Sequence, residues 1–298
     1  MSDNPLISAS ELLGVLRDRP VSTPPPILLD VRWTLAGSDR AAYLDGHLPG
    51  AFFVDLDNDL AGAPGDGGRH PLPDPTDLEA VWRSVGMTDR DSVVVYDGGI
   101  GMAAARAWWL LRWSGFDAVR VLDGGLPAWT GAGQPTASGA ESPPAVGTVT
   151  VNPGSMPVVT ADEAAELASS TDGLLVDARA AARFRGEIEP IDPVAGHIPG
   201  SVNLPIAELL TAADGTFRSP GELAAAFRGV GVGVGIGPGD RDAAAGGRPG
   251  TVAASCGSGV TACQLILAAE IAGLRLSLFP GSYSQWCAIG RPVAVGAT

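Results

Sequence analysis

The stretch TVAASCGSGVT, residues 251–261, sets the fold of this chain: a short apolar strand runs into a glycine-rich turn. A helix-forming run, Ala262–Ala272, follows at once. This order places the thiol of Cys256 against a helix N-terminus, where unpaired backbone N–H groups and the helix dipole favour an anion. The thiolate is the nucleophilic form of cysteine, and the two glycines allow N–H groups to turn toward the sulfur. We therefore expect Cys256 to be a nucleophile that carries a transferable group.

The rest of the chain repeats itself around this motif. Four features of the first half recur in the second half in the same order. The matching segments are ILLDVR 27–32 with LLVDAR 174–179, HLPGA 47–51 with HIPGS 197–201, VVVYDG 93–98 with VAASCG 252–257, and Gly124, Gly125 and Trp129 with Gly281, Ser282 and Trp286. This order indicates a tandem duplication of one domain.

Helix starts repeat as well. A hydroxyl residue followed three positions later by glutamate is a capping box, in which side chains satisfy the free N–H groups of a first turn. Four such pairs stand at matching places in the two halves: Ser8 with Glu11, Thr160 with Glu163, Thr76 with Glu79, and Ser219 with Glu222. Short apolar strands alternate with these helices. The pattern predicts an α/β fold in which each half is a mostly parallel sheet with helices on both faces, and sites lie at the carboxyl ends of the strands.

Composition changes suggest the domain boundaries. We expect a first domain over residues 1–135, a linker over 136–157 that is rich in Pro, Ser, Gly and Thr, and a second domain over 158–298. Gly229–Gly250 never completes a dinucleotide-binding fingerprint and is interpreted as a mobile surface insertion.

Composition also excludes several partners and cofactors. The net charge of −14 argues against nucleic acid and anionic membranes, and all 19 basic residues are arginine, so lysine chemistry is absent. Three cysteines and three scattered histidines form no metal motif, and no cofactor is predicted. The N-terminus lacks the pattern of a signal peptide, and no apolar run reaches transmembrane length, so a cytoplasmic location is expected. The oligomeric state is left open.

The whole chain resembles the tandem-domain rhodanese-type sulfurtransferases, a group that includes thiosulfate and 3-mercaptopyruvate sulfurtransferases. The resemblance rests on Asp-x-Arg before His-x-Pro-Gly in both halves, on the Cys256 loop, and on the closing segment PGSYSQW, residues 280–286. It implies two tandem rhodanese-like domains. Asp97 stands where the first domain of such proteins has lost its cysteine, so residues 1–135 are expected to be catalytically silent.

The resemblance also implies a chemistry. The Cys256 thiolate would take a sulfur from a small anionic donor as a persulfide and pass it to cyanide or a thiol. Backbone N–H groups of the loop would hold the persulfide anion, and the resemblance assigns the donor-binding loop to Gly257, Gly259, Val260 and Thr261. Gly257 and Ser258 are neutral where thiosulfate-specific relatives carry two cations, which favours 3-mercaptopyruvate as donor with thiosulfate a close second.

Charged and titratable side chains complete the expected site. Arg183 matches the substrate arginine of the family, and Arg185 is the candidate for a second arginine that is missing before His197. His47 is expected to form a proton relay with Ser258, with its orienting carboxylate left open between Asp39 and Asp45.

Other chemistry-bearing residues are expected to be structural. These are Cys263 and Cys287, the ion-pairing Arg179, the loop-bracing His197, and the core residues Trp108, Trp109 and Trp113, whereas His70 is expected to be exposed or interdomain.

Two other functions compete with sulfur transfer. A cysteine phosphatase would need an arginine six residues after Cys256, but that position is Ala262. A non-catalytic sulfur-relay or scaffold protein is the stronger alternative, because Asp97 shows that one half has already lost its thiol.

Overall fold

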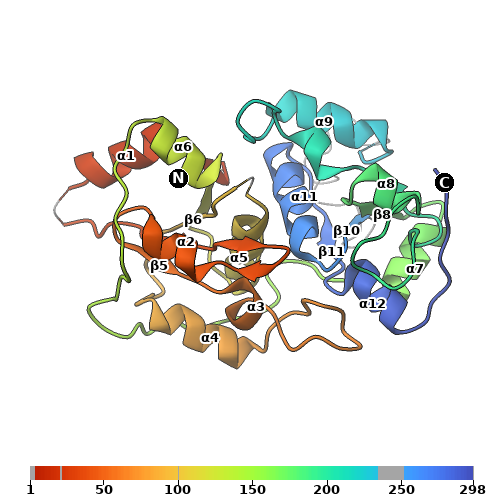
Figure 1. Cartoon of the computed structure of the whole chain (residues 1–298), viewed down its shortest axis with the longest axis horizontal. Coiled ribbons are helices and arrows are strands. Elements are labelled where there is room, and N and C mark those ends of the chain that lie inside the picture. Colours follow the sequence, from red (N-terminus) through yellow and green to blue (C-terminus); the bar gives the residue numbers. More distant parts are fainter. Residues whose placement is uncertain (1–3, 21, 100, 234–251, 298) are drawn as a thin grey trace. The chain divides into compact units, whose positions relative to one another are not determined.

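The computed structural model describes residues 4–20, 22–99, 101–233 and 252–297. The chain divides into two compact units, each built on its own sheet (Figure 1). Unit 1 comprises the residues up to Gly62, Leu72–Ser155 and Ala213–Thr216. Unit 2 comprises Ala63–Pro71, Met156–Ala212 and the residues from Phe217 onward.

Unit 1 contains a parallel sheet of five strands in the order β1-β7-β6-β2-β5. The strands are β1 (Leu6–Ile7), β2 (Ile27–Asp30), β5 (Ala51–Phe53), β6 (Val93–Tyr96) and β7 (Val119–Leu122), with the short antiparallel pair β3 (Trp33–Thr34) and β4 (Gly37–Ser38) beside them. The helices are α1 (Ala9–Asp18), α2 (Arg40–Asp45), α3 (Leu56–Asp59), α4 (Pro75–Ser84), α5 (Met102–Trp113) and α6 (Gly125–Gly131).

Both faces of this sheet are buried, which explains its nearly continuous apolar strands. Val94 and Tyr96 of β6 join the core beneath α1 and α6. The alternate residues Val93 and Val95 are buried too. Successive side chains of a strand point to opposite faces, and α5 packs on β6 and β7. Trp108, Trp109 and Trp113 lie on α5 and are buried, as predicted.

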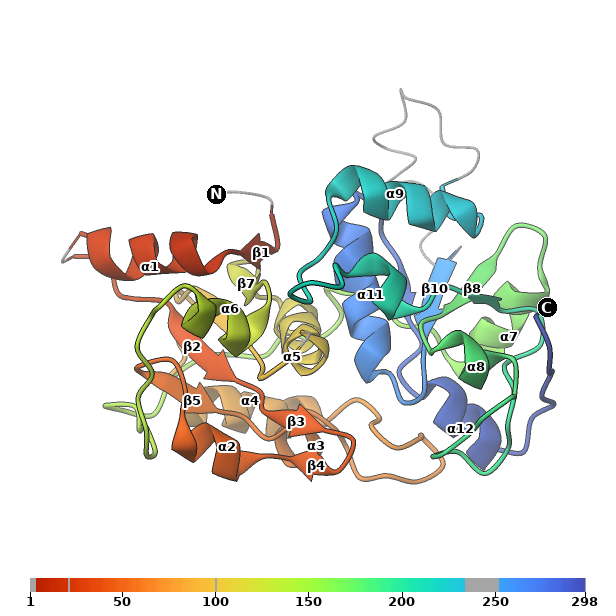
Figure 2. The same ribbon diagram turned by 45° about the horizontal axis from the view of Figure 1, so that its top comes forward.

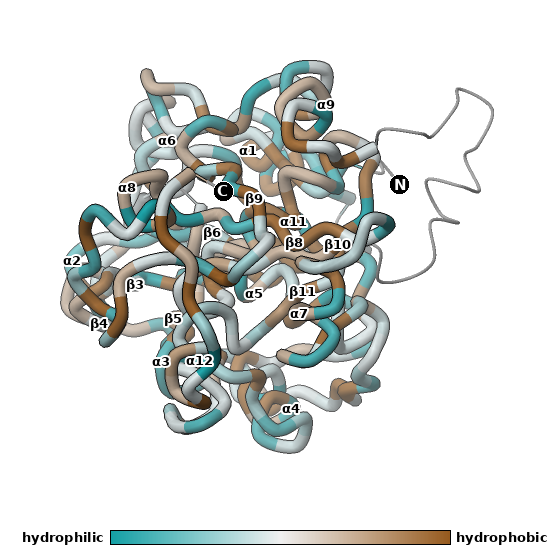
Figure 3. The backbone as a smooth tube through the Cα atoms, turned by 90° about the vertical axis from the view of Figure 1, so that its right-hand side faces the viewer, coloured by the Kyte–Doolittle hydropathy of each residue, from teal (hydrophilic) through white to brown (hydrophobic). Residues whose placement is uncertain are grey.

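Unit 2 repeats the plan with a parallel sheet in the order β11-β10-β8-β9. Its strands are β8 (Leu174–Asp177), β9 (Val202–Asn203), β10 (Val252–Ser255) and β11 (Ser277–Leu278). Its helices are α7 (Ala161–Ser169), α8 (Ala181–Phe184), the 3-10 helix η1 (Ile206–Leu209), α9 (Pro220–Gly229), α11 (Val260–Ile271) and α12 (Ser282–Ala288). Within this unit, α9 packs on α11, and α7 packs on α12 and the sheet (Figure 2). The two strands at the centre of the sheet, β8 and β10, consist mainly of hydrophobic residues (Figure 3).

The predicted capping boxes are confirmed at three of the four sites. The side-chain hydroxyls of Ser8, Thr160 and Ser219 each accept a hydrogen bond from the backbone N–H of the glutamate three residues later. The side chain of that glutamate accepts a hydrogen bond from the backbone N–H of the capping residue. The prediction was wrong at Thr76. There α4 begins two residues earlier, because Asp74 caps the helix and Pro75 suits its first position.

The contact-based units differ from the predicted domain boundaries in three places, one of which is Ala213–Thr216, a segment of the second half that belongs to unit 1. Residues of the expected linker pack onto unit 1: the N–H of Gly147 donates to the Arg83 carbonyl at 2.8 Å, and Val149 is fully buried. In the other direction, residues 63–71 belong to unit 2 although they come from the first half of the chain. Of the predicted insertion, Gly229 closes α9 and Gly231 and Gly233 turn with positive φ, while 234–250 lie outside the described residues.

Within the described part of the chain, no helix is both long and apolar enough to cross a bilayer.

Candidate active site

Cys256 follows the last residue of β10, an inner strand of the unit 2 sheet, and precedes α11 by a three-residue turn. The turn needs glycine at 259, where φ is +83° and a Cβ atom would stand 2.3 Å from the Pro280 carbonyl oxygen. This backbone turns the N–H of Gly259 toward the sulfur, with N to Sγ at 3.2 Å. Val260 and Thr261 form the first turn of α11, so the expected donor-binding loop lies directly at a helix start.

The start of α12 holds the loop in place. The Cys256 N–H donates to the Ser282 hydroxyl at 3.0 Å, the Tyr283 N–H donates to the Cys256 carbonyl at 3.0 Å, and the Ser284 N–H donates to the Gly257 carbonyl at 2.8 Å. Ser282 adopts a φ of +50°, a strained value for a residue with a Cβ. These bonds fix both sides of the Cys256 peptide.

The equivalent loop of unit 1 shows what this backbone shape binds. The Asp97 carboxylate follows β6 as Cys256 follows β10. It accepts N–H bonds from Gly99, Gly101 and Ala103 at 3.0 Å each and from Ala104 at 3.3 Å. Unit 1 thus keeps a covalently attached anion where unit 2 has a thiol. The shared strand–turn–helix backbone is therefore a cradle for negative charge.

Ser258 has an imidazole partner, but it is His70 and not the predicted His47. His70 Nδ1 and Ser258 Oγ lie 2.7 Å apart, with both residues in unit 2. His47 belongs to unit 1 and is fully buried, with its ring stacked on Tyr43 and Nδ1 2.9 Å from the Tyr43 carbonyl oxygen. A side chain without exposed surface is poorly placed for proton exchange with a substrate. We therefore replace the predicted His47–Ser258 relay with a His70–Ser258 pair.

His47 has the structural role that was expected for His197. The His197 ring stacks on Phe184, and its Nδ1 lies 2.8 Å from the Phe184 carbonyl oxygen. The two histidines of the repeated His-x-Pro-Gly turns are thus equivalent braces. The candidate carboxylate Asp39 caps α2 through the N–H of Ala42.

Two guanidinium groups lie over the Cys256 loop. A Cβ atom on Gly257 would be 3.0 Å from Nη2 of Arg69 and 3.7 Å from Nη1 of Arg183. Arg183, the predicted substrate arginine, therefore lies beside the loop. Arg185, the expected second arginine, instead pairs with Glu187 at 2.7 Å and is 39% exposed. The second cation at the loop is therefore Arg69.

Arg179 forms the ion pair expected of it. Its guanidinium contacts Asp177 at 2.8 Å and donates to the Gly196 carbonyl at 2.8 Å, both buried. Arg32 pairs with Asp30 at 2.7 Å and donates to the Gly46 carbonyl in the same way in unit 1. The repeated Asp-x-Arg motif thus ties the strand end to the His-x-Pro-Gly turn in both units.

None of the three cysteines, all of which lie in the described part of the chain, forms a disulfide. Cys256 is buried, with 2% of the residue exposed. Cys263 is buried and donates to the Gly259 carbonyl at 3.2 Å, which supports the loop from below. Burial raises the pKa of the Cys287 thiol above its usual value, which makes it a poor nucleophile at neutral pH. Among the described residues, no group of three or more His, Cys, Asp or Glu side chains is arranged to hold a metal ion.

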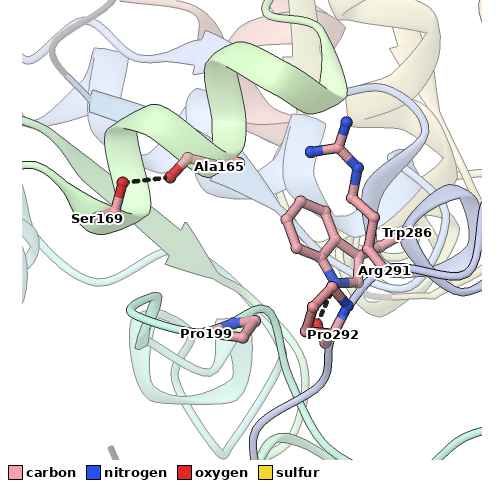
Figure 4. Close-up of a pocket in the computed structure, with 6 residues that line it drawn as sticks. All are labelled: Ala165, Ser169, Pro199, Trp286, Arg291 and Pro292. Carbon is pink, nitrogen blue, oxygen red and sulfur yellow. Dashed lines mark hydrogen bonds between the residues drawn. The ribbon is translucent and has the colours of Figure 1, made fainter.

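A separate cavity of about 510 Å³ lies on unit 2 between α7 and the segment after α12 (Figure 4). Its lining is largely apolar, and the Arg291 guanidinium stacks on the Trp286 ring at 5.0 Å. The lining residues are Ala165, Ser169, Pro199, Trp286, Arg291 and Pro292. None of them is a thiol, imidazole or carboxylate, so we assign this cavity no part in the chemistry of Cys256.

Comparison with known proteins identifies the family. The sequence of the chain matches the rhodanese-like domain family twice, over residues 9–132 and 160–289. The chain belongs to the rhodanese family. The predicted resemblance and the predicted fold of two rhodanese domains are thereby confirmed.

Rhodanese-family relatives match over nearly the whole chain. SseB of Mycobacterium tuberculosis, which carries the name of a thiosulfate sulfurtransferase, is 42% identical over 98% of this chain and 97% of its own length. A Pseudomonas aeruginosa protein that carries the name of a 3-mercaptopyruvate sulfurtransferase is 40% identical over 99% of this chain and 100% of its own. The crystal structure of SseA from Escherichia coli, described with the 3-mercaptopyruvate enzymes, superposes with a TM-score of 0.75 at 30% identity, covering 94% of this chain and 99% of that one.

Sequence reasoning missed the two residues that come from the segment 63–71. His70 and Arg69 stand in a loop rich in Gly and Pro, outside the sequence segments that match between the two halves. The useful signal was the pair itself, an arginine and a histidine side by side in a chain with three histidines in all.

Proposed function

We propose that this rhodanese is a sulfurtransferase that moves a sulfur atom from a small anionic donor, through a persulfide on Cys256, to cyanide or a thiol. The observation that carries the proposal is the pair of equivalent loops. One loop encloses the Asp97 carboxylate with four N–H donors, and the other presents Cys256 in the same strand–turn–helix setting. A backbone that holds a carboxylate is suited to a thiolate and to the persulfide anion that follows from it.

With 3-mercaptopyruvate the first step is a displacement at sulfur. The Cys256 thiolate attacks the donor sulfur, an S–S bond forms, and the C–S bond breaks with its electron pair passing to the pyruvate enolate. The enolate then takes a proton at carbon to become pyruvate, and the Ser258–His70 pair is the nearby proton source. In the second step cyanide or a thiolate attacks the outer sulfur and restores the Cys256 thiolate.

The choice of donor rests on charge. The relatives divide between thiosulfate and 3-mercaptopyruvate names, so similarity alone leaves the donor open. At the loop, Gly257 and Ser258 are neutral, and the cations over it are guanidinium groups that suit a planar carboxylate. We therefore favour 3-mercaptopyruvate, with thiosulfate as the second donor. Three cysteines without a disulfide suit a reducing compartment, and we propose the cytoplasm.

Mass spectrometry of the intact protein tests this proposal. Incubation with 3-mercaptopyruvate should add one sulfur atom to Cys256, cyanide should remove it with release of thiocyanate, and Cys256→Ser should gain none. Kinetics with each donor and cyanide as common acceptor then rank the donors. If neither donor added sulfur to Cys256, the alternative of a non-catalytic sulfur-relay or scaffold protein would be favoured.

A further inference from the structure

The two arginines over the Cys256 loop are already paired with buried carboxylates. Arg69 Nη1 contacts Asp192 Oδ1, and Arg183 Nη2 lies 3.1 Å from Asp192 Oδ2. Arg183 also contacts both oxygens of Glu189, at 2.6 and 3.2 Å. The Asp192 carboxylate therefore bridges the two guanidinium groups that face Gly257.

Both acidic side chains are withdrawn from solvent. The side chains of Asp192 and Glu189 are 1% and 3% exposed, whereas those of Arg69 and Arg183 are 31% and 16% exposed. Burial by itself would raise the pKa of Glu189, but hydrogen bonds from Arg183 and from the N–H groups of Asp192 and Ile191 outweigh it and lower that pKa. Glu189 is therefore a carboxylate at neutral pH.

The charges at the loop nearly cancel. Arg69 and Arg183 contribute two positive charges, and the carboxylates of Asp192 and Glu189 that they contact contribute two negative ones. The neighbouring Arg179–Asp177 pair adds no net charge. The loop therefore presents N–H groups to the sulfur donor but surrounds it with no strong positive field.

This balance affects donors of different charge unequally. Thiosulfate carries two negative charges and is repelled by a nearby carboxylate about twice as strongly as a monoanion is. A carboxylate donor resembles Asp192 itself in shape and charge, and can share the fork-shaped guanidinium groups with it. We infer that Asp192 is a specificity-determining residue, which disfavours doubly charged donors at Cys256 and favours donors with a single carboxylate. The inference deepens the proposed function and rests on it.

The variant Asp192→Asn tests this role, because asparagine keeps the volume and one acceptor oxygen and removes the charge. The matched control is Glu187→Gln, which removes a charge from the exposed Arg185 pair. We expect the ratio of kcat/KM for thiosulfate to that for 3-mercaptopyruvate to rise about tenfold or more in Asp192→Asn and to stay unchanged in the control. A carboxylate that only braced the fold would change both donors in proportion, and that result would overturn the inference.

Inhibition of the wild-type protein gives a second test that does not depend on the variant folding. Pyruvate, a single carboxylate, should inhibit persulfide formation at lower concentration than sulfate, a dianion of similar size. Stronger inhibition by sulfate would overturn the role of Asp192. A wild-type protein that accepts sulfur from neither donor would instead refute the proposed function, so the two failures are distinguishable.

Discussion

Replacing Gly259 with alanine probes the geometry of the cradle directly. The residue has a φ of +83°, and an added Cβ would lie 2.3 Å from the Pro280 carbonyl oxygen and 3.1 and 3.2 Å from the Pro280 C and Cα atoms. All three contacts are with backbone, which cannot rotate away as a side chain can. The loop or the chain before α12 must therefore move.

The expected cost follows from two terms. A left-handed backbone costs an alanine about 1–2 kcal/mol, and forcing a methyl group into occupied space adds about 1–3 kcal/mol. We therefore expect Gly259→Ala to lower the free energy of unfolding by about 2–5 kcal/mol. The Gly259 N–H also donates to Cys256 Sγ. Loss of a hydrogen bond to a charged group, at about 1.5–3 kcal/mol, should slow persulfide formation about ten- to hundredfold.

Gly290→Ala is the matched control, because Gly290 has a φ of +69° and no atom lies within 4 Å of its added Cβ. Gly290→Ala should lower the free energy of unfolding only by the cost of the left-handed backbone, about 1–2 kcal/mol, and should form persulfide at the wild-type rate. Urea unfolding measures the stability of both variants, and mass spectrometry measures their rate of sulfur gain. The reasoning is refuted if Gly259→Ala unfolds at the same urea concentration as Gly290→Ala and forms persulfide normally.

Three further predictions concern side chains around the loop. His70→Asn should lower kcat with 3-mercaptopyruvate by about 10²–10⁴-fold, and steady-state assays should show a much smaller loss with thiosulfate, whose sulfite product needs no proton on carbon. Arg69→Ala should raise the donor KM at least about tenfold, as expected for a lost charged hydrogen bond, whereas Arg185→Ala should leave it unchanged; equal effects would remove Arg69 from the site. Glu189→Gln should destabilise the protein by about 1–3 kcal/mol at neutral pH. Since the folded pKa of Glu189 is lowered, its contribution is present above the unfolded value of about 4.3 and is lost as the pH falls through the folded value. Unfolding curves of this variant and of the exposed control Glu166→Gln at several pH values should therefore converge with the wild type in acid, and a gap that persists there would contradict the pairing.

The sequence predicted the fold well because its signals are local and occur twice. The capping boxes at Ser8, Thr160 and Ser219 depend on residues three positions apart, and each is present in the structure. The failure at Thr76 has a local cause as well, since Asp74 followed by Pro75 is the stronger helix start. The matched positions of Asp97 and Cys256 likewise follow from the duplication.

The site was only partly predictable for the opposite reason. Cys256, Ser258 and Arg183 lie on one repeat and could be identified from its motif. His70 is 188 residues from Ser258, and Arg69 is 123 residues from Asp192. Such pairings depend on where a non-repeated loop packs, and no periodicity encodes that. His47 was the natural choice for the relay because its motif is repeated, but repetition marked it as a brace like His197.

The segment 63–71 belongs to unit 2. The first half has Asp97 in place of a thiol, yet its loop 63–71 supplies an imidazole and a guanidinium group beside the Cys256 loop of unit 2. A truncated protein with the second half alone would contain Cys256 but neither Arg69 nor His70. The second half therefore depends on residues that the first half of the chain encodes.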